Sequence, residues 1–139
     1  MHMKKMIIKD LYNCDYITSD EELYPLQKWY NAVLDKTIDD VNVADVLRMF
    51  RQKEFMDIAY KKSVEFLQDN PFAGELYDGE LMKKVSELND DELKGLSSVL
   101  SEIVDKALIQ NEKYEWIDDD EQKEFGELLK DLQKRLVKL

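Results

Sequence analysis

Apolar residues recur at helical spacing along most of the chain. Between residues 24 and 35 they fall on one side of a helix, and Pro25 suits the first turn of that helix. Two more stripes cover residues 43–52 and residues 54–69. Asn42 precedes the first of these stripes and is typical of a residue that caps a helix N-terminus. The first half of the chain therefore predicts three helices.

The second half continues the helical pattern after a break at Asn70-Pro71, because proline lacks an amide proton and restricts the residue before it. Asp78 is expected to cap a short helix over residues 79–88. Two longer helices follow, one of about twenty residues that starts at Asn89 or Asp90 and one near residues 119–138. Their apolar positions repeat every three and four residues, so the two helices are expected to pack as an antiparallel pair. These positions are Leu93, Leu96, Leu100, Ile103 and Ala107, then Phe125, Leu129, Leu132, Leu136 and Leu139.

The stripes predict an all-α fold, with a single compact domain over residues 1–139, about six helices and the antiparallel pair at its C-terminal end. The chain has only four glycines and two prolines, and so few turn formers favour helices over a many-stranded sheet. The short apolar run Met6-Ile7-Ile8 leaves one alternative open, a strand at the edge of a dimer.

Acidic charge is concentrated in the second half of the chain. The formal net charge is −11, from 31 acidic and 20 basic residues. Residues 1–62 hold 11 acidic and 10 basic residues, whereas residues 63–139 hold 20 acidic and 10 basic residues. Such a field repels nucleic acid and anionic lipid and attracts basic proteins, although acidity also serves plain solubility.

The sequence offers little for catalysis. His2 is the single histidine and lies at the N-terminus. The single cysteine, Cys14, therefore has no histidine besides His2 that could activate it. No glycine-rich phosphate loop is present, and zinc lacks its usual thiol and imidazole ligands. The acidic run from Asp118 to Glu121 does not fit the register of a calcium-binding loop. We therefore expect no enzyme activity, no metal site and no cofactor.

The chain is expected to be cytoplasmic. No segment approaches the roughly 18 apolar residues of a membrane span. The apolar run near the N-terminus is too short for a signal peptide. We therefore expect partners that are neither membranes nor nucleic acids.

The acidic residues are densest between the last two predicted helices. Residues 112–127 hold eight acidic and two basic residues and enclose Tyr114 and Trp116. An aromatic side chain ringed by carboxylates is a common anchor for a basic partner, but the same rings could instead pack the loop onto the core. A second acidic segment, residues 65–92, has a net charge of −7. The candidate partner-binding residues are Glu112, Tyr114, Glu115, Trp116, Asp118, Asp119, Asp120 and Glu121, with Glu75 and Glu80 as the alternative patch.

Residues 43–88 carry a series of short motifs at defined spacing. The motif positions are Arg51-Gln52, Leu67, Asn70-Pro71, Gly74-Glu75, Tyr77 and Gly79-Glu80-Leu81. Together they resemble the immunity proteins of contact-dependent growth inhibition (CDI) systems, and Leu23 to Asp35 fits the first helix of that family. The resemblance covers about half of the chain and leaves the residues from 90 onwards outside it.

The resemblance implies a protein that binds the C-terminal toxin domain delivered by neighbouring bacteria and that has no catalytic activity. Many such toxins are nucleases with basic clefts, which a polyanionic surface can steer towards and cover. The resemblance also implies that the residues which determine toxin specificity lie in the C-terminal segment, which varies between members of the family. Gly74 and Gly79 are expected to let the chain turn between helices, not to touch the partner. The alternative function is an acidic adaptor, or a nucleic-acid-mimicking inhibitor of another basic protein.

Overall fold

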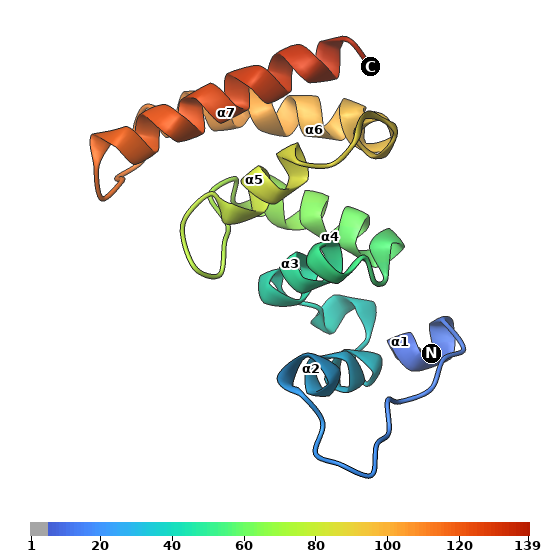
Figure 1. Cartoon of the computed structure of the whole chain (residues 1–139). Helices are drawn as coiled ribbons and strands as arrows, with labels where there is room; N and C mark the ends of the chain where they lie inside the picture. Colours follow the sequence, from blue (N-terminus) through green and yellow to red (C-terminus); the bar gives the residue numbers. More distant parts are fainter. Residues whose placement is uncertain (1–5) are drawn as a thin grey trace, which may run out of the picture.

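The computed structural model describes residues 6–139, and this part of the chain forms seven α-helices and one 3₁₀ turn (Figure 1). The helices are α1 (Ile8–Leu11), α2 (Pro25–Leu34), α3 (Val43–Gln52), α4 (Met56–Asp69), α5 (Glu80–Ser86), α6 (Asp90–Asn111) and α7 (Asp119–Val137). The 3₁₀ turn is Ile38–Asp40, and His2 lies outside the described residues. The all-α prediction is confirmed, and the helix beyond the expected six is α1.

The helices are stacked from one end of the molecule to the other. In Figure 1, α1 and α2 lie at one end, the α3/α4 pair and α5 follow, and α6 and α7 form the opposite layer. One hydrophobic cluster connects these layers, from Ile8 and Val33 through Ile58 and Leu81 to Leu129. Most helix contacts join elements that are close in sequence, as expected for helices linked by short loops.

The predicted antiparallel pair at the C-terminus is confirmed. α6 and α7 lie side by side, and the Gln133 amide donates a hydrogen bond to Asp105 across the pair at 2.8 Å. The pair is also fixed to the rest of the stack by Arg135 of α7. Its guanidinium donates hydrogen bonds to the carbonyls of Ser86 and Leu88 at 2.8 and 2.6 Å, and to the Asp90 carboxylate at 2.8 Å. The end of α7 is thereby held against the α5–α6 turn.

The strand alternative for Met6-Ile7-Ile8 is wrong for the described residues of this run. Ile7 makes a single antiparallel bridge with Thr37, and Ile8 begins α1. The backbone N–H of Ile8 also donates to the carbonyl of Lys36 at 2.8 Å. The partner of this extended residue therefore lies in the turn after α2 of the same chain.

Side-chain caps fix several predicted helix ends. Asn42 accepts a hydrogen bond from the backbone N–H of Asp45 at 2.8 Å, and Asn89 accepts one from that of Glu92 at the same distance. These bonds satisfy N–H groups that have no partner within the helix. The start of α4 differs from the prediction by two residues, because Phe55 adopts a left-handed conformation (φ 52°) that the helix cannot include.

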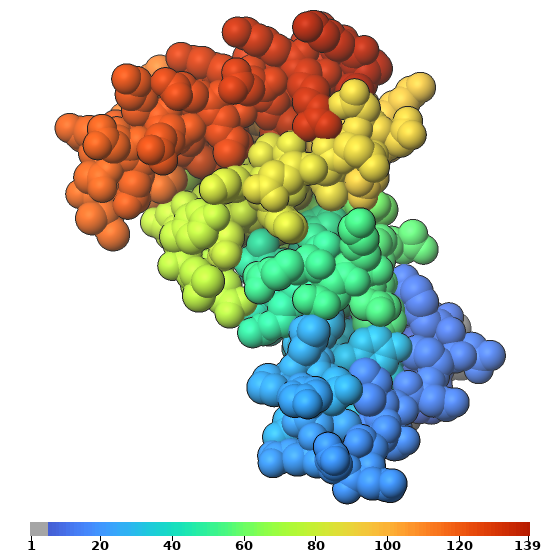
Figure 2. Space-filling model, in the orientation of Figure 1, coloured from blue at the N-terminus to red at the C-terminus, as the bar shows by residue number. Residues whose placement is uncertain are grey.

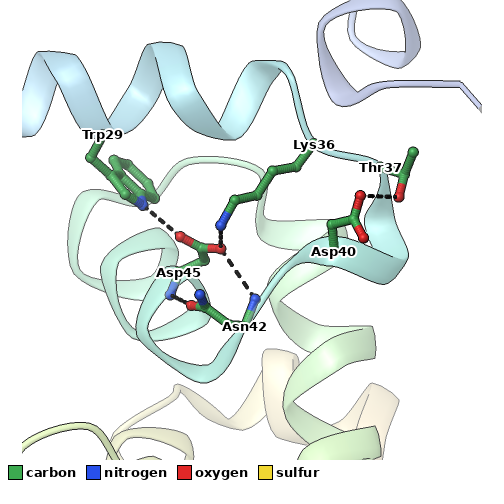
Figure 3. A network of polar contacts seen from close by, with 6 residues as sticks. All are labelled: Trp29, Lys36, Thr37, Asp40, Asn42 and Asp45. Carbon is green, nitrogen blue, oxygen red and sulfur yellow. Dashed lines mark hydrogen bonds and ion pairs between the residues drawn. The ribbon is translucent and has the colours of Figure 1, made fainter.

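A buried carboxylate joins α2 to the start of α3 (Figure 3). Asp45 is 3% exposed and accepts hydrogen bonds from the indole N–H of Trp29 at 3.0 Å and from the ammonium of Lys36 at 2.6 Å. The backbone N–H of Asn42 donates to it as well, at 3.1 Å. Since a buried charge is stable only when it is paired and hydrogen-bonded, Asp45 serves to fix α2 against α3.

Candidate protein-binding site

Two loops that are distant in sequence meet beside the start of α7. The first loop comprises residues 70–79 and the second loop comprises residues 112–118; both lie on the left of Figure 1. Four aromatic rings connect them: Phe72, Tyr114, Trp116 and Phe125. Phe72 stacks on Tyr114 with ring centroids 3.8 Å apart, and Trp116 lies 5.3 Å from Phe125. The rings of the second loop therefore pack it onto the core, which was one of the two alternatives.

The first loop is held by a buried carboxylate that follows it. Glu80 is 9% exposed and accepts hydrogen bonds from the backbone N–H groups of Glu75 and Leu76 at 2.8 and 2.9 Å. The loop also turns tightly at Gly74, where an added Cβ would lie 2.0 Å from the carbonyl oxygen of Tyr77. The spacing between Gly74 and Glu80 in the motif therefore has a structural cause, because Gly74 permits the turn and Glu80 holds it.

Gly79 brings the first loop against the aromatic cluster. Its φ of 85° is left-handed, and a Cβ there would lie 2.9 Å from the ring of Phe125. Its N–H donates to the carbonyl of Phe72 at 2.8 Å. Gly79 itself occupies the N-cap position of α5, so the prediction that Asp78 caps this helix is wrong. The Asp78 carboxylate instead accepts a hydrogen bond from the Tyr114 hydroxyl at 2.6 Å, which links the two loops.

This link affects how the tyrosine titrates. Two effects raise the pKa of Tyr114 to about 12: the hydrogen bond to Asp78, which is the larger, and partial burial. Burial and a hydrogen bond to Glu92 likewise raise the pKa of Tyr60 to about 12. Both phenols therefore stay protonated at neutral pH, and the Tyr114 hydroxyl remains a donor.

The second loop is fixed through Asn111, which is 7% exposed at the end of α6. The indole N–H of Trp116 donates to the Asn111 side-chain oxygen at 2.7 Å. The Asn111 amide donates to the carbonyl of Gln122 at 3.1 Å, and the Gln122 amide donates back to the carbonyl of Asn111 at 2.7 Å. Gly126 leaves room for this arrangement, since a Cβ there would lie 3.2 Å from the Asn111 amide nitrogen.

The structure brings the two predicted acidic patches together, because the loops that carry them are in contact. The acidic candidates at the surface are Glu75, Glu112, Glu115, Asp118, Asp119 and Asp120. Glu121, Tyr114 and Trp116 are half-buried, and Glu80 is buried. Asp118 also caps α7 by accepting a hydrogen bond from the backbone N–H of Glu121 at 2.8 Å.

Three exposed apolar residues on the same loops are not apparent as candidates from the sequence pattern. Ile117 is 94% exposed, Leu76 is 77% exposed and Tyr77 is 51% exposed. A signal for Ile117 was present in the sequence. An apolar residue just before an N-cap usually packs on the fourth residue of the helix, and here that residue is Gln122. Apolar groups surrounded by charge at a surface are typical of protein contacts.

A small cleft lies between the first loop and α7, with a volume of about 270 Å³. In Figure 2 the first loop, in yellow-green, lies directly below the orange start of α7. The apolar lining of the cleft is Gly79, Trp116, Phe125 and Leu128. Its polar lining is Tyr77, Asp78, Lys83, Glu121 and Glu124.

Within residues 6–139, no group of three or more His, Cys, Asp or Glu side chains is placed to hold a metal ion. No helix in this part of the chain is both long and apolar enough to cross a membrane.

Together the two loops form a surface that has exposed apolar groups, surrounding acidic residues and a small cleft.

A sequence profile of the CDI immunity proteins matches residues 10–103. The chain belongs to this family. Its membership makes it an immunity protein against a CDI toxin, and such proteins generally have no enzymatic activity. No curated protein is similar enough to match the chain. The matched region of this CDI immunity protein contains the whole first loop and ends within α6, so the second loop and α7 lie outside it.

Proposed function

We propose that this CDI immunity protein neutralises the toxin domain of its own system by covering a basic cleft with the surface of its two loops. The toxin domain is a nuclease in this proposal, and the immunity protein acts in the cytoplasm without catalysing a reaction. The observation that supports it is the position of Leu76, Tyr77 and Ile117, which are exposed among carboxylates on two loops that contact each other.

The charge of this surface suits a nuclease. A nuclease cleft presents Lys and Arg to phosphate groups, and carboxylates on a binding partner can occupy the same field. Residues 112–127 hold eight acidic residues, and the first loop adds Glu75 and Asp78. Such a concentration of like charge accelerates the encounter with a cationic partner.

The exposed apolar residues supply the affinity that steering alone does not. Burying a large apolar side chain contributes roughly 1.5–3 kcal/mol relative to leaving it in water. Ile117 and Leu76 are almost fully available for such burial. Glu80 is not part of the proposed contact, because its carboxylate is buried and accepts hydrogen bonds from the backbone of the first loop. Trp116 and Tyr114 contribute by holding the second loop in place.

The test is co-expression with the toxin domain of the same CDI system. We expect the two proteins to co-purify, the cells to survive, and added immunity protein to stop cleavage of nucleic acid by the purified toxin. A toxin that kills cells despite co-expression would contradict the immunity role. A neutralised toxin that cleaves no nucleic acid would contradict the nuclease assignment alone.

The surface is tested separately by replacing Leu76, Tyr77 and Ile117 with serine in one variant. We expect this variant to fold and to lose protection. The matched control replaces three exposed apolar residues at the opposite end of the stack, Leu11, Tyr24 and Leu26, with serine. Loss of protection only in the control would move the docking surface to the N-terminal end.

A further inference from the structure

We propose that the cleft between the first loop and α7 binds one arginine side chain of the toxin. This inference rests on the proposed function and specifies the chemistry of the contact. The cleft, of about 270 Å³, is slightly smaller than the roughly 300–1,000 Å³ of small-molecule sites. It therefore suits a single side chain better than a whole ligand.

The apolar lining of the cleft favours a planar cation. Trp116 and Phe125 both line the cleft, with their ring centroids 5.3 Å apart, and Leu128 lines it as well. A guanidinium group is weakly hydrated, stacks on aromatic rings and gains a cation–π attraction, which is strongest with Trp. An ammonium group is compact and strongly hydrated, so lysine gains less from the same lining.

Three carboxylates from two different segments line the same cleft. Asp78 comes from the first loop, whereas Glu121 and Glu124 come from the first two turns of α7. The side chain of Asp78 is oriented by the Tyr114 hydroxyl, and α7 is fixed at its start by the Asp118 cap. Carboxylates that come from both of these segments suit the forked donors of a guanidinium. Lys83 is the one cation in the lining and opposes the bound charge.

The chemistry of the cleft is tested with N-acetyl-arginine amide as a probe on ¹⁵N-labelled full-length protein. The two indole N–H groups provide the readout, because Trp116 lines the cleft and Trp29 bonds to Asp45 in the N-terminal half. We expect the probe to shift the Trp116 signal and to leave the Trp29 signal unchanged. A probe that shifts neither signal, or both equally, overturns the proposal.

Two further probes separate arginine recognition from general attraction. Nα-acetyl-citrulline amide has nearly the same shape as the arginine probe but no charge. Nα-acetyl-lysine amide keeps a positive charge on its side chain but lacks the planar fork of donors. We expect little shift with citrulline and a clearly weaker affinity with lysine. Equal binding of citrulline overturns the role of the carboxylates, and equal binding of lysine overturns the assignment of arginine.

Variants of the protein give effects of opposite sign. Glu121→Gln with Glu124→Gln should weaken the arginine probe by about tenfold, which corresponds to about 1.4 kcal/mol. Lys83→Gln should strengthen it, because a like charge is removed. The matched control, Asp69→Asn with Glu102→Gln, removes two exposed charges outside the cleft and should leave affinity unchanged. An equal loss in the control shows a general charge effect and overturns the proposal.

The toxin itself supplies the final test. Each exposed arginine of the toxin domain is replaced with alanine, and its affinity is measured against wild-type protein and the Glu121/Glu124 double variant. One arginine should show strong coupling, so that its loss costs nothing further in the double variant. A toxin that binds wild type and double variant equally overturns the arginine site and leaves the proposed function intact. A toxin that does not bind at all contradicts the proposed function, whatever the probes show.

Discussion

The two loops of the candidate site are built in different ways. The first loop is held largely by its own segment, because Glu80 binds the backbone of Glu75 and Leu76, and Gly74 permits the turn. The second loop has one internal backbone hydrogen bond, from the Trp116 N–H to the Tyr114 carbonyl at 3.1 Å, but its side-chain contacts reach outside the loop. It is held by aromatic rings and by Asn111, which belongs to the end of α6.

The difference indicates which part of the site is general and which part is specific. The first loop lies inside the region matched by the CDI immunity family, and its motif residues Gly74, Gly79 and Glu80 are used for the fold, whereas Glu75 and Tyr77 are exposed. The second loop lies outside that region and carries most of the exposed carboxylates. Part of the motif therefore forms a scaffold for the first loop, and we expect the choice between toxins to depend mainly on residues 112–127.

The largest effect on stability is expected from Gly79→Ala. The added Cβ is strained at a left-handed φ and meets the ring of Phe125 at 2.9 Å, so we expect a loss of about 3 kcal/mol. Gly95→Ala is the control, because nothing lies within 4 Å of its Cβ position in the second turn of α6. The control should stabilise the protein by roughly 0.5–1 kcal/mol. Urea unfolding followed by circular dichroism measures both, and equal effects would show that the first loop does not need this glycine.

Glu80→Ala should cost about 2 kcal/mol, because two backbone N–H groups of the first loop lose a charged acceptor. Glu80→Gln keeps an oxygen acceptor and should cost clearly less. Hydrogen exchange at Glu75 and Leu76 should accelerate in the alanine variant and stay slow in the glutamine variant. Unchanged exchange in both variants would show that the loop is held by other contacts.

Asn111→Ala examines the second loop in the same way. Removal of this side chain leaves the indole N–H of Trp116 without its acceptor, and we expect a loss of about 1.5 kcal/mol. The loosened loop should raise Trp116 solvent exposure, measured by quenching of its fluorescence in a Trp29→Phe background. If Asn111→Ala leaves both stability and quenching unchanged, the aromatic packing alone holds the second loop.

Much of the fold could be predicted from the sequence because local signals determine it. Asn42 and Asn89 cap helices as their positions indicate, and Asn70-Pro71 ends α4. The role of Asp78 could not be predicted in this way. Its partner, Tyr114, is 36 residues away, and only the tertiary fold decides that this carboxylate binds a phenol and does not cap α5.

For the candidate site, the sequence suggests a location but not the arrangement of its side chains. The density of charge pointed to residues 112–127, and the structure adds the first loop as its neighbour. The sequence could not distinguish which aromatic or apolar side chain faces solvent. Trp116 packs on Phe125, whereas Ile117, the next residue, is 94% exposed.

Tyr114→Phe should have a smaller effect, about 1 kcal/mol at neutral pH, because one hydrogen bond between the loops is lost. It should also change the alkaline dependence of stability. The pKa of Tyr114 rises from 10.0 to about 12 on folding, so the native state binds this proton more tightly. The resulting stability is fully present below pH 10 and is lost as the pH rises towards 12.

The measurement is the free energy of unfolding as a function of pH in wild type and variant. We expect the alkaline loss to be smaller in Tyr114→Phe but still present, because the pKa of Tyr60 is raised to about 12 as well. Asp78→Ala should behave like Tyr114→Phe, since it removes the acceptor of the same bond. An unchanged alkaline profile in both variants would show that the two loops are not linked through this phenol.

The smallest effect on stability is expected from replacing Asp118, Asp119 and Asp120 with asparagine. Asparagine at position 118 still caps α7, so we expect a change below about 1 kcal/mol. Toxin binding should respond in its association rate, which we expect to fall by about tenfold at low salt and to lose much of its salt dependence. The dissociation rate should stay nearly the same.

Ile117→Ala should show the opposite pattern. Ile117 is exposed in the free protein and becomes buried in the proposed complex, so its loss speeds dissociation and leaves the electrostatic steering of the toxin intact. The control for the triple variant replaces Asp10, Asp15 and Asp20 with asparagine, which changes the net charge equally at the other end of the stack. Stopped-flow kinetics across a range of salt concentrations distinguishes these variants. If the 118–120 variant and the control associate equally fast at low salt, the second loop does not guide the toxin. The docking surface then centres on the first loop, and the family scaffold itself carries the contact.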